Sequence, residues 1–201
     1  ETGIGMAEWC AAQGYQLVCG GEMGIGNTTT SAAVTAVLTG ANVRDVTGRG
    51  AGLSSEGLER KVHAIETALA LHRPDPEDPV DILHKVGGLD IAGMAGFYLG
   101  AAACGLPVVL DGVISCAAAL IAVRLCPAVR DYLIAAHQSA EPAGRLLLEA
   151  LGYTPFISAG MRLGEGTGAV AAVAMIDLVL AAYDGMPSFD EAGIEAYQPL
   201  T

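Results

Sequence analysis

The stretch that decides the fold is Tyr15-Gln16-Leu17-Val18-Cys19-Gly20-Gly21-Glu22-Met23-Gly24-Ile25-Gly26-Asn27-Thr28-Thr29-Thr30. Its first five residues are largely apolar and predict a buried β-strand. Residues 31–39, rich in Ala and Val and closed by Gly40, predict a helix. A strand, a glycine-rich turn and a helix in this order open a parallel α/β unit.

The same alternation continues outward along the chain. Pro107-Val108-Val109-Leu110-Asp111-Gly112 is the clearest further strand, with Asp111 near its carboxyl end, and Asp131–Ala136 is another. Further helices are predicted at Ile4–Gln13, Glu56–Leu71, Val80–Lys85, Ile91–Cys104, Ser115–Leu125, Ala143–Leu151 and Ala169–Tyr183. Small residues in Ile91–Cys104 allow close helix packing. We therefore expect an α/β fold with a parallel sheet flanked by helices.

Composition and charge exclude some classes of function. The chain has 201 residues, of which 52% are hydrophobic and 16% charged, which suits a folded domain and excludes disorder. Ten Lys and Arg residues against 22 Asp and Glu residues give a net charge of −12, without a basic cluster. Nucleic acid and anionic membrane surfaces are therefore not expected as partners. Backbone N–H groups at a helix start can still hold a small anion.

The spacing of the cysteines and the lengths of the apolar runs indicate whether the chain binds a metal, where in the cell it lies and whether it spans a membrane. The five cysteines are widely spaced and form no C-x-x-C pair, so we expect no metal site and no disulfide framework, and a cytoplasmic location. The longest apolar runs, Val113–Val123 and Ala169–Ile176, are shorter than a membrane span. Because the chain begins at Glu1 instead of Met, we expect it to be a piece of something longer.

Polar, glycine-containing loops follow the strands or strand-like segments. Ligands of open parallel sheets bind at the carboxyl ends of the strands. The loops are Gly20–Thr30, Asp111–Ser115, His137–Glu141 and Gly160–Gly168. We expect them to converge on one site that contains Glu22, Asp111, Ser139 and Glu165.

The glycines of Gly24–Thr28 allow two interpretations. They could let backbone N–H groups cradle a phosphate where Asn27 and Thr28 begin a helix, or they could serve tight strand-to-helix packing. The segment has neither the Lys of a Walker A loop nor the third glycine of a dinucleotide fingerprint. The residues alone leave both interpretations open.

Two charged residues and a histidine are also ambiguous. Glu165, among glycines, is either a charge that caps a helix or a general base in a partly dehydrated pocket. Lys61 is either a solvated charge or a phosphate partner. The four histidines lack ligand spacing, and only His137, which follows a strand, is expected near a site.

Six ordered blocks together resemble a known family, the nicotinate-nucleotide–dimethylbenzimidazole phosphoribosyltransferases. They span residues 21–168 and match the C-terminal part of the family's length, so that roughly the first two-fifths is absent. The blocks are Gly21–Thr29, Gly48-Arg49-Gly50, Lys85–Met94, Val109-Leu110-Asp111-Gly112, Ala136–Pro142 and Gly160–Gly168.

The resemblance implies a fold and a reaction. The fold would be a Rossmann-like parallel sheet flanked by helices over residues 1–184. A tail, residues 185–201, would pack on a small helical domain to which it contributes. The reaction would transfer a 5-phosphoribosyl group from nicotinate mononucleotide to 5,6-dimethylbenzimidazole, with inversion, giving α-ribazole 5′-phosphate and nicotinate. It would need no cofactor, and the protein would be a homodimer.

The resemblance also assigns roles to residues. Glu165 matches the catalytic base, and Glu22 a second carboxylate that faces the ribose. The remaining matches are Gly24, Gly26, Asn27, Thr28 and Lys61 on the phosphate side, Asp90, Asp111 and Ser139 around the ribose and base, and Leu163 and Gly164 against the aromatic ring. The alternative is a truncated, catalytically impaired module that binds a mononucleotide or serves in assembly.

Overall fold

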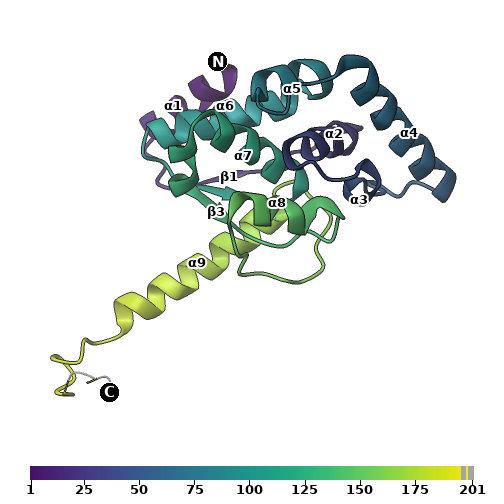
Figure 1. Ribbon diagram of the computed structural model, residues 1–201. Coiled ribbons are helices and arrows are strands. Elements are labelled where there is room, and N and C mark those ends of the chain that lie inside the picture. The colour runs from purple at the N-terminus through teal and green to yellow at the C-terminus, as the bar shows by residue number, and fades with distance from the viewer. Residues whose placement is uncertain (196–197, 199–201) are drawn as a thin grey trace.

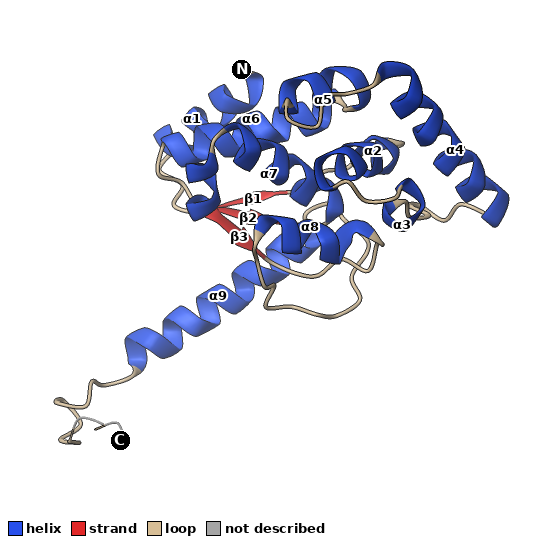
Figure 2. Ribbon diagram, viewed as in Figure 1, coloured by secondary structure: helices blue, strands red, loops and turns tan. Residues whose placement is uncertain are grey.

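A three-stranded parallel sheet forms the centre of the protein. In the computed structural model, which describes residues 1–195 and residue 198, the strands are β1 (Val18–Gly20), β2 (Val108–Leu110) and β3 (Leu133–Ala135), in the order β1-β2-β3. Cys19 pairs with Val109, and Val109 with Ile134. The three strands lie side by side (Figure 2). The predicted α/β fold with a parallel sheet is confirmed.

Helices account for most of the rest of the chain (Figure 1). They are α1 (Thr2–Ala12), α2 (Asn27–Thr39), α3 (Val43–Val46), α4 (Ser55–His72), α5 (Pro79–Val86), α6 (Leu89–Ala103), α7 (Val113–Leu125), the 3₁₀ helix η1 (Pro127–Tyr132), α8 (Ala143–Leu151) and α9 (Thr167–Gly185). All the predicted helices are present, and the short α3 was not expected.

All three strands are shorter than predicted, and the one expected over Pro107–Gly112 is limited to Val108–Leu110. The first was expected over Tyr15–Cys19, but pairing starts at Val18, whose N–H donates to Pro107 O at 3.1 Å, where the neighbouring strand begins. The strand expected over Asp131–Ala136 is limited to Leu133–Ala135, because Pro127 opens a 3₁₀ helix that runs to Tyr132. The strands end within two residues of the expected positions, so the loops that follow them begin close to where they were expected.

The two faces of the sheet are covered by different helices. Val108 and Leu110 belong to the large hydrophobic core, which also includes buried residues of α1, α2, α6, α7 and α8. Val109, which points to the opposite face, packs in a smaller cluster with Ala169 and Ala172 of α9. In Figure 2 the strands accordingly lie between α7 on one side and the start of α9 on the other.

The small residues of α6 allow α1 to pack closely against it. A Cβ atom added at Gly100 would lie 2.8 Å from the Cα of Ile4, and one added at Gly3 would collide with the carbonyl oxygen of Gly93. This confirms the close packing expected from the small residues of that segment.

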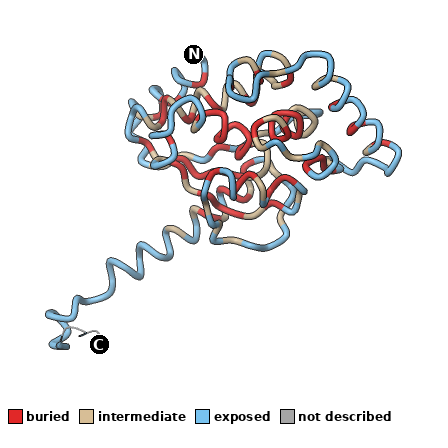
Figure 3. Tube along the Cα trace, in the orientation of Figure 1, coloured by how far each residue is buried: buried red, intermediate tan, exposed pale blue. Residues whose placement is uncertain are grey.

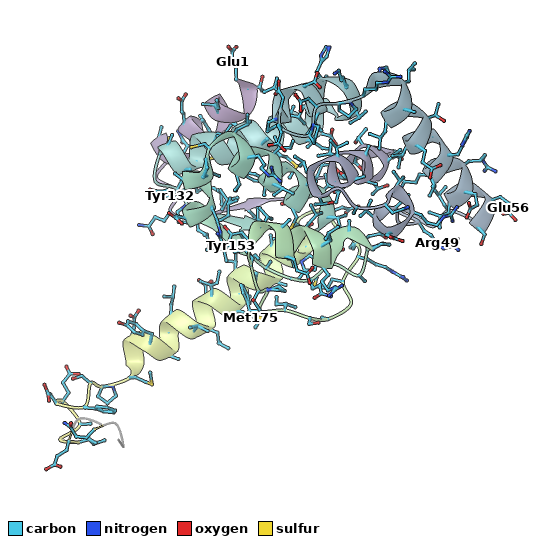
Figure 4. All side chains as sticks on the ribbon, in the orientation of Figure 1. Glu1, Arg49, Glu56, Tyr132, Tyr153 and Met175 are labelled. Carbon is cyan, nitrogen blue, oxygen red and sulfur yellow. The ribbon has the colours of Figure 1, made fainter. Side chains whose placement is uncertain are left out.

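Helix α9 leaves the body of the protein after its first turns (Figures 1 and 3). By length and composition alone this helix could cross a membrane. The expectation that the apolar runs are too short for this is wrong here, because the helix continues past Asp177 to Gly185. Only 17% of its most apolar 18-residue window is buried. Its exposed apolar residues are Val170, Met175, Leu178, Val179, Leu180 and Tyr183. Figure 4 labels Met175 on this helix.

The expected tail, residues 185–201, is described only in part. Met186, Phe189 and Ile194 are exposed. Residues 196–197 and 199–201 lie outside the described part of the chain.

Candidate active site

A cavity of about 280 Å³ opens at the carboxyl ends of the three strands. All four predicted loops contribute to its lining, joined by the loop that contains Gly50. The lining residues are Glu22, Gly24, Asn27, Thr28, Gly50, Ala51, Asp111, Gly112, Val113, Ile114, Ser115, His137, Ser139, Glu141, Arg162, Leu163, Gly164 and Glu165. The expected convergence of Glu22, Asp111, Ser139 and Glu165 on one site is therefore confirmed.

The start of α2 forms one wall of the cavity. Gly26 precedes the helix with φ +91°, a left-handed conformation, and no side chain caps the helix. Asn27 Nδ2 donates a hydrogen bond to Glu22 Oε2. A Cβ atom at Gly24 would lie 2.5 Å from Glu22 Oε1 and 2.7 Å from Asn27 Nδ2, so a side chain there would displace this hydrogen-bonded pair. Asn27 and Thr28, the first two residues of α2, line the cavity, and the N–H of Thr29 donates to Gly26 O at 2.9 Å.

Glu22 is held in a setting that disfavours its charge. Burial and the nearby carboxylate of Asp90 raise the pKa of Glu22, and the hydrogen bond from Asn27 opposes this rise. Asp90 lies in the first turn of α6 and is not among the residues that line the cavity in the described structure. Asp90 therefore affects the site through the electrostatic effect of its carboxylate on the pKa of Glu22.

Lys61 is buried, so its interpretation as a solvated surface charge is wrong. Its side chain is 7% exposed, and Nζ donates to Thr28 Oγ1 at 2.8 Å and to Gly48 O at 2.9 Å. Burial lowers the pKa of Lys61, and the carboxylate of Glu141 opposes this. Lys61 and Gly26 are not among the lining residues of the described structure. Lys61 stands directly behind the start of α2.

Glu165 sits in an unusual turn at the cavity. Gly164, Glu165 and Gly166 have φ angles of +78°, +59° and +77°, three consecutive left-handed residues. The N–H of Glu165 donates to Glu22 O at 3.1 Å. A non-glycine residue in this region costs free energy and is enriched at functional sites. The turn leaves the side chain of Glu165 exposed, beside the segment that carries Glu22.

Asp111 connects this turn to the sheet. The residue is 3% exposed, and its Oδ2 accepts a hydrogen bond from Gly166 N at 3.1 Å. Its Oδ1 accepts from Gly168 N at 2.8 Å and from Ala169 N at 3.2 Å. Asp111 was expected near the ribose and base, and it does line the cavity. Its carboxylate oxygens, however, are used by the first N–H groups of α9, so it acts as the cap of that helix.

Some lining residues were not predicted individually. Arg162, Glu141 and Gly112–Ser115 lie in loops that were expected at the site, but no individual role was predicted for them. His137, expected near the site, is 3% exposed and lines the cavity. Burial lowers the pKa of His137, and the charge of Asp111 opposes this. The strand-end positions of His137 and Glu141 were the signal available in the sequence.

The residues do not gather as metal ligands. Within the described part of the chain, no three or more His, Cys, Asp or Glu side chains form a group that could hold a metal ion. The site can supply carboxylates, a helix start for an anion, and apolar walls at Val113, Ile114 and Leu163.

Together, fold and site define an α/β protein with a carboxylate-rich ligand cavity at the ends of its parallel strands. Comparison with known proteins narrows this class. The chain belongs to the phosphoribosyltransferase family DBI_PRT, which matches residues 1–194. The resemblance noted from the sequence blocks is confirmed.

Individual relatives agree with this membership. The chain is 49% identical over 199 residues to the nicotinate-nucleotide–dimethylbenzimidazole phosphoribosyltransferase of Acetivibrio thermocellus, covering 99% of this chain and 57% of the relative. The enzyme of the same name from Roseiflexus is 53% identical over 194 residues, covering 96% and 55%. The crystal structure of CobT from Thermus thermophilus superposes with a TM-score of 0.88 at 42% identity, covering 96% of this chain and 57% of that one. The chain thus spans little more than half the length of these relatives.

Proposed function

We propose that this chain carries the catalytic cavity of a phosphoribosyltransferase. The enzyme would transfer the 5-phosphoribosyl group of nicotinate mononucleotide to 5,6-dimethylbenzimidazole, giving α-ribazole 5′-phosphate and nicotinate. The observation that carries the proposal is the left-handed turn that holds Glu165 at the cavity, hydrogen bonded to the backbone of Glu22. The names of the relatives support the choice of substrates.

The proposed chemistry needs one base and electrostatic support. The bond between C1′ and the pyridinium nitrogen breaks, its electron pair neutralises that nitrogen, and nicotinate leaves without protonation. One benzimidazole nitrogen forms the new bond to C1′, and the proton on its other nitrogen passes to the Glu165 carboxylate. The carboxylate of Glu22 stabilises the positive charge that develops on the ribose.

The phosphate is proposed to sit at the start of α2. Gly24 and Gly26 open this helix start, and Asn27 and Thr28 offer their backbone N–H groups. Lys61 places its charge behind Thr28 at 2.8 Å. These contacts are local, so they can bind a phosphate despite the net charge of −12.

Other residues of the proposed site act on the sugar and the rings. Ser139 is proposed to contact the ribose or base, and Leu163 and Gly164 to lie against the aromatic ring, since all three line the cavity. Asp90 is proposed to act by raising the pKa of Glu22 through its charge. Asp111 is proposed to act by holding the turn that carries Glu165 through its hydrogen bond from Gly166 N.

The proposal includes a homodimer in the cytoplasm that binds neither nucleic acid nor membrane. The exposed apolar residues of α9 support an assembly in which protein covers this helix. The five free cysteines are compatible with a reducing compartment.

The direct test incubates the chain with nicotinate mononucleotide and dimethylbenzimidazole and measures nicotinate and α-ribazole 5′-phosphate. A second protein, called the extended chain, has the part of the Acetivibrio thermocellus relative that this chain lacks fused ahead of Glu1. Turnover by either protein supports the proposal. If both proteins bind the nucleotide tightly but neither turns it over, the alternative, a mononucleotide-binding module, is favoured. That alternative is supported by the fact that the chain covers only 57% of that relative.

A further inference from the structure

The hydroxyl of Ser115 joins the ends of two neighbouring strands. Ser115 lies in the first turn of α7 and is 2% exposed. Its Oγ donates a hydrogen bond to the carbonyl oxygen of Gly20, the last residue of β1, at 2.8 Å, and accepts one from the N–H of Asp111, the residue after β2, at 3.1 Å. The same N–H also donates to Gly20 O at 3.2 Å. Ser115 therefore bridges β1 and β2 at the point where their loops begin.

A buried tyrosine completes the hydrogen bonds of Ser115. Tyr98 of α6 is fully buried, and its hydroxyl oxygen lies 2.8 Å from Ser115 Oγ. A serine hydroxyl has one proton to donate and two lone pairs that can accept. Because the proton of Ser115 goes to Gly20 O, Tyr98 is the donor in its hydrogen bond with Ser115. Burial raises the pKa of Tyr98 far above the ordinary value of a tyrosine, so the phenol keeps the proton that it donates.

Both strand ends hold the turn that carries Glu165. On the β1 side, Gly21 lies against Gly166, because a Cβ added at Gly21 would be 2.6 Å from the Cα of Gly166. The next residue, Glu22, accepts a hydrogen bond from Glu165 N at its carbonyl oxygen, at 3.1 Å. On the β2 side, Asp111 Oδ2 accepts one from Gly166 N at 3.1 Å. The relative position of the two strand ends therefore determines where the Glu165 carboxylate lies.

We propose that Ser115 and Tyr98 are positioning residues for the reaction, which hold the ends of β1 and β2 together and so fix the turn that carries Glu165. This proposal rests on the proposed function. Ser115 lines the cavity, but its proton and both of its lone pairs are already used within the protein, so it has none left for a ligand. Tyr98 is not among the lining residues of the described structure. Both residues therefore act on the reaction through the strand ends and not by contact with a substrate.

The first test measures the transfer reaction on the extended chain. Ser115→Ala removes the bridge between the strands. We expect it to lower kcat about 10-fold or more while it changes the KM for nicotinate mononucleotide less than about 3-fold, since a small displacement of a catalytic group mainly slows the chemical step. Tyr98→Phe keeps the ring and the bridge but removes the donor to Ser115, and it should lower kcat by about 3-fold or more. An unchanged kcat in both variants would overturn the proposal.

Two matched controls remove hydroxyl groups of the same kinds away from this network. Ser31→Ala truncates a buried serine whose Oγ has no hydrogen-bond partner among the described residues. Tyr153→Phe removes a hydroxyl that donates to Arg130 O. Both controls should keep the kcat of the unmodified protein. An equal loss of kcat in the controls would overturn the proposal, because general loosening of the fold would then account for it.

A combined variant shows whether the network acts through Glu165. In a Glu165→Gln background the base is already lost, so adding Ser115→Ala should lower the remaining rate less than about 2-fold. A decrease as large as the one that Ser115→Ala causes by itself would overturn the proposal, because the effect would then be independent of Glu165.

Hydrogen exchange separates this proposal from the proposed function. In the 201-residue chain, Ser115→Ala should accelerate exchange of the Glu165 and Gly166 amides about 10-fold more than that of the Leu147 and Leu148 amides within α8. This result supports the positioning role even if neither protein transfers the phosphoribosyl group, an outcome that would defeat the proposed function alone. Equal acceleration at the turn and in α8, or none at the turn, overturns the proposal. If Ser115→Ala does not fold, the same comparison on Tyr98→Phe decides.

Discussion

The carboxylate of Asp111 accepts a hydrogen bond from the backbone N–H of Gly166 at 3.1 Å, which ties the end of β2 to the residue after Glu165. The other oxygen of Asp111 holds the N–H groups of Gly168 and Ala169. A buried carboxylate with three donors fixes the backbone of the turn from below. The position of the Glu165 side chain at the cavity therefore depends on Asp111, which follows β2 and lies far from Glu165 in the sequence.

Replacing Asp111 with Asn should disturb this turn. An amide has one acceptor oxygen, so its NH₂ group would face either the N–H of Gly166 or those of Gly168 and Ala169, and would leave one or two buried donors unpaired. We expect a loss of about 1–3 kcal/mol in the free energy of unfolding, and faster hydrogen exchange at Gly166 or at Gly168 and Ala169. Denaturation and exchange measurements check this. Asp177→Asn, on the exposed part of α9, is the matched control, and an equal effect there would contradict the role of Asp111.

Replacing Glu165 with Gln should abolish most of the transfer. The side chain keeps its size but cannot accept the benzimidazole proton, and a positioned base contributes about 10²–10⁴-fold to the rate. Binding of nicotinate mononucleotide should change little, because the base acts on the acceptor. Turnover and calorimetry on the extended chain measure the two effects, with Glu149→Gln on the exposed face of α8 as control. Turnover near that of the unmodified protein would remove Glu165 from the mechanism.

Much of the fold, and the convergence of the loops on one site, could be predicted from patterns close in sequence, but the contacts within the site could not. The apolar strand before Asp111 and the glycines before Asn27 are local signals. The burial of Lys61 depends on Thr28 and Gly48, which reach it through tertiary packing. No local pattern distinguishes such a lysine from a solvated one.

The same limit applies to the carboxylates of the site. Asp111 stands 55 positions before Gly166, so the sequence showed an acidic residue at a strand end but not the three N–H groups that occupy it. For this reason its role as a helix cap was missed.

Replacing Lys61 with Met should weaken the phosphate side of the site. The Met side chain fills similar space but leaves Thr28 Oγ1 and Gly48 O without their donor. We expect a loss of about 1–3 kcal/mol in the free energy of unfolding and a weaker affinity for nicotinate mononucleotide, by about 10-fold. Lys85→Met, which removes an ion pair with Asp81 near the surface, should cost at most about 1 kcal/mol. Unchanged nucleotide affinity in Lys61→Met would show that the residue is only structural.

Acid should destabilise the fold through His137. Burial lowers the pKa of this imidazole in the folded state below its ordinary value of 6.5, although Asp111 opposes the shift. As the pH falls through 6.5 the unfolded state therefore binds a proton before the folded state does, and the free energy of unfolding declines until the pH is below the folded-state pKa. Denaturation of His137→Gln at several pH values should show a shallower decline. His63→Gln, at an exposed position of α4, should keep the decline of the wild-type chain.

The apolar surface of α9 should make the isolated chain self-associate. Leu178 is 75% exposed and Val179 66%, on a helix that the body of the protein contacts only near its start. Contiguous apolar surface of this kind drives association, so sedimentation should show a mass that increases with concentration. Leu178→Glu should reduce this association without loss of stability, because the side chain makes little contact within the chain. Leu71→Glu, at a residue of α4 that is 72% exposed, is the matched control and should leave the association unchanged. A chain that remains monomeric over the whole concentration range would show that α9 needs no cover from a second copy.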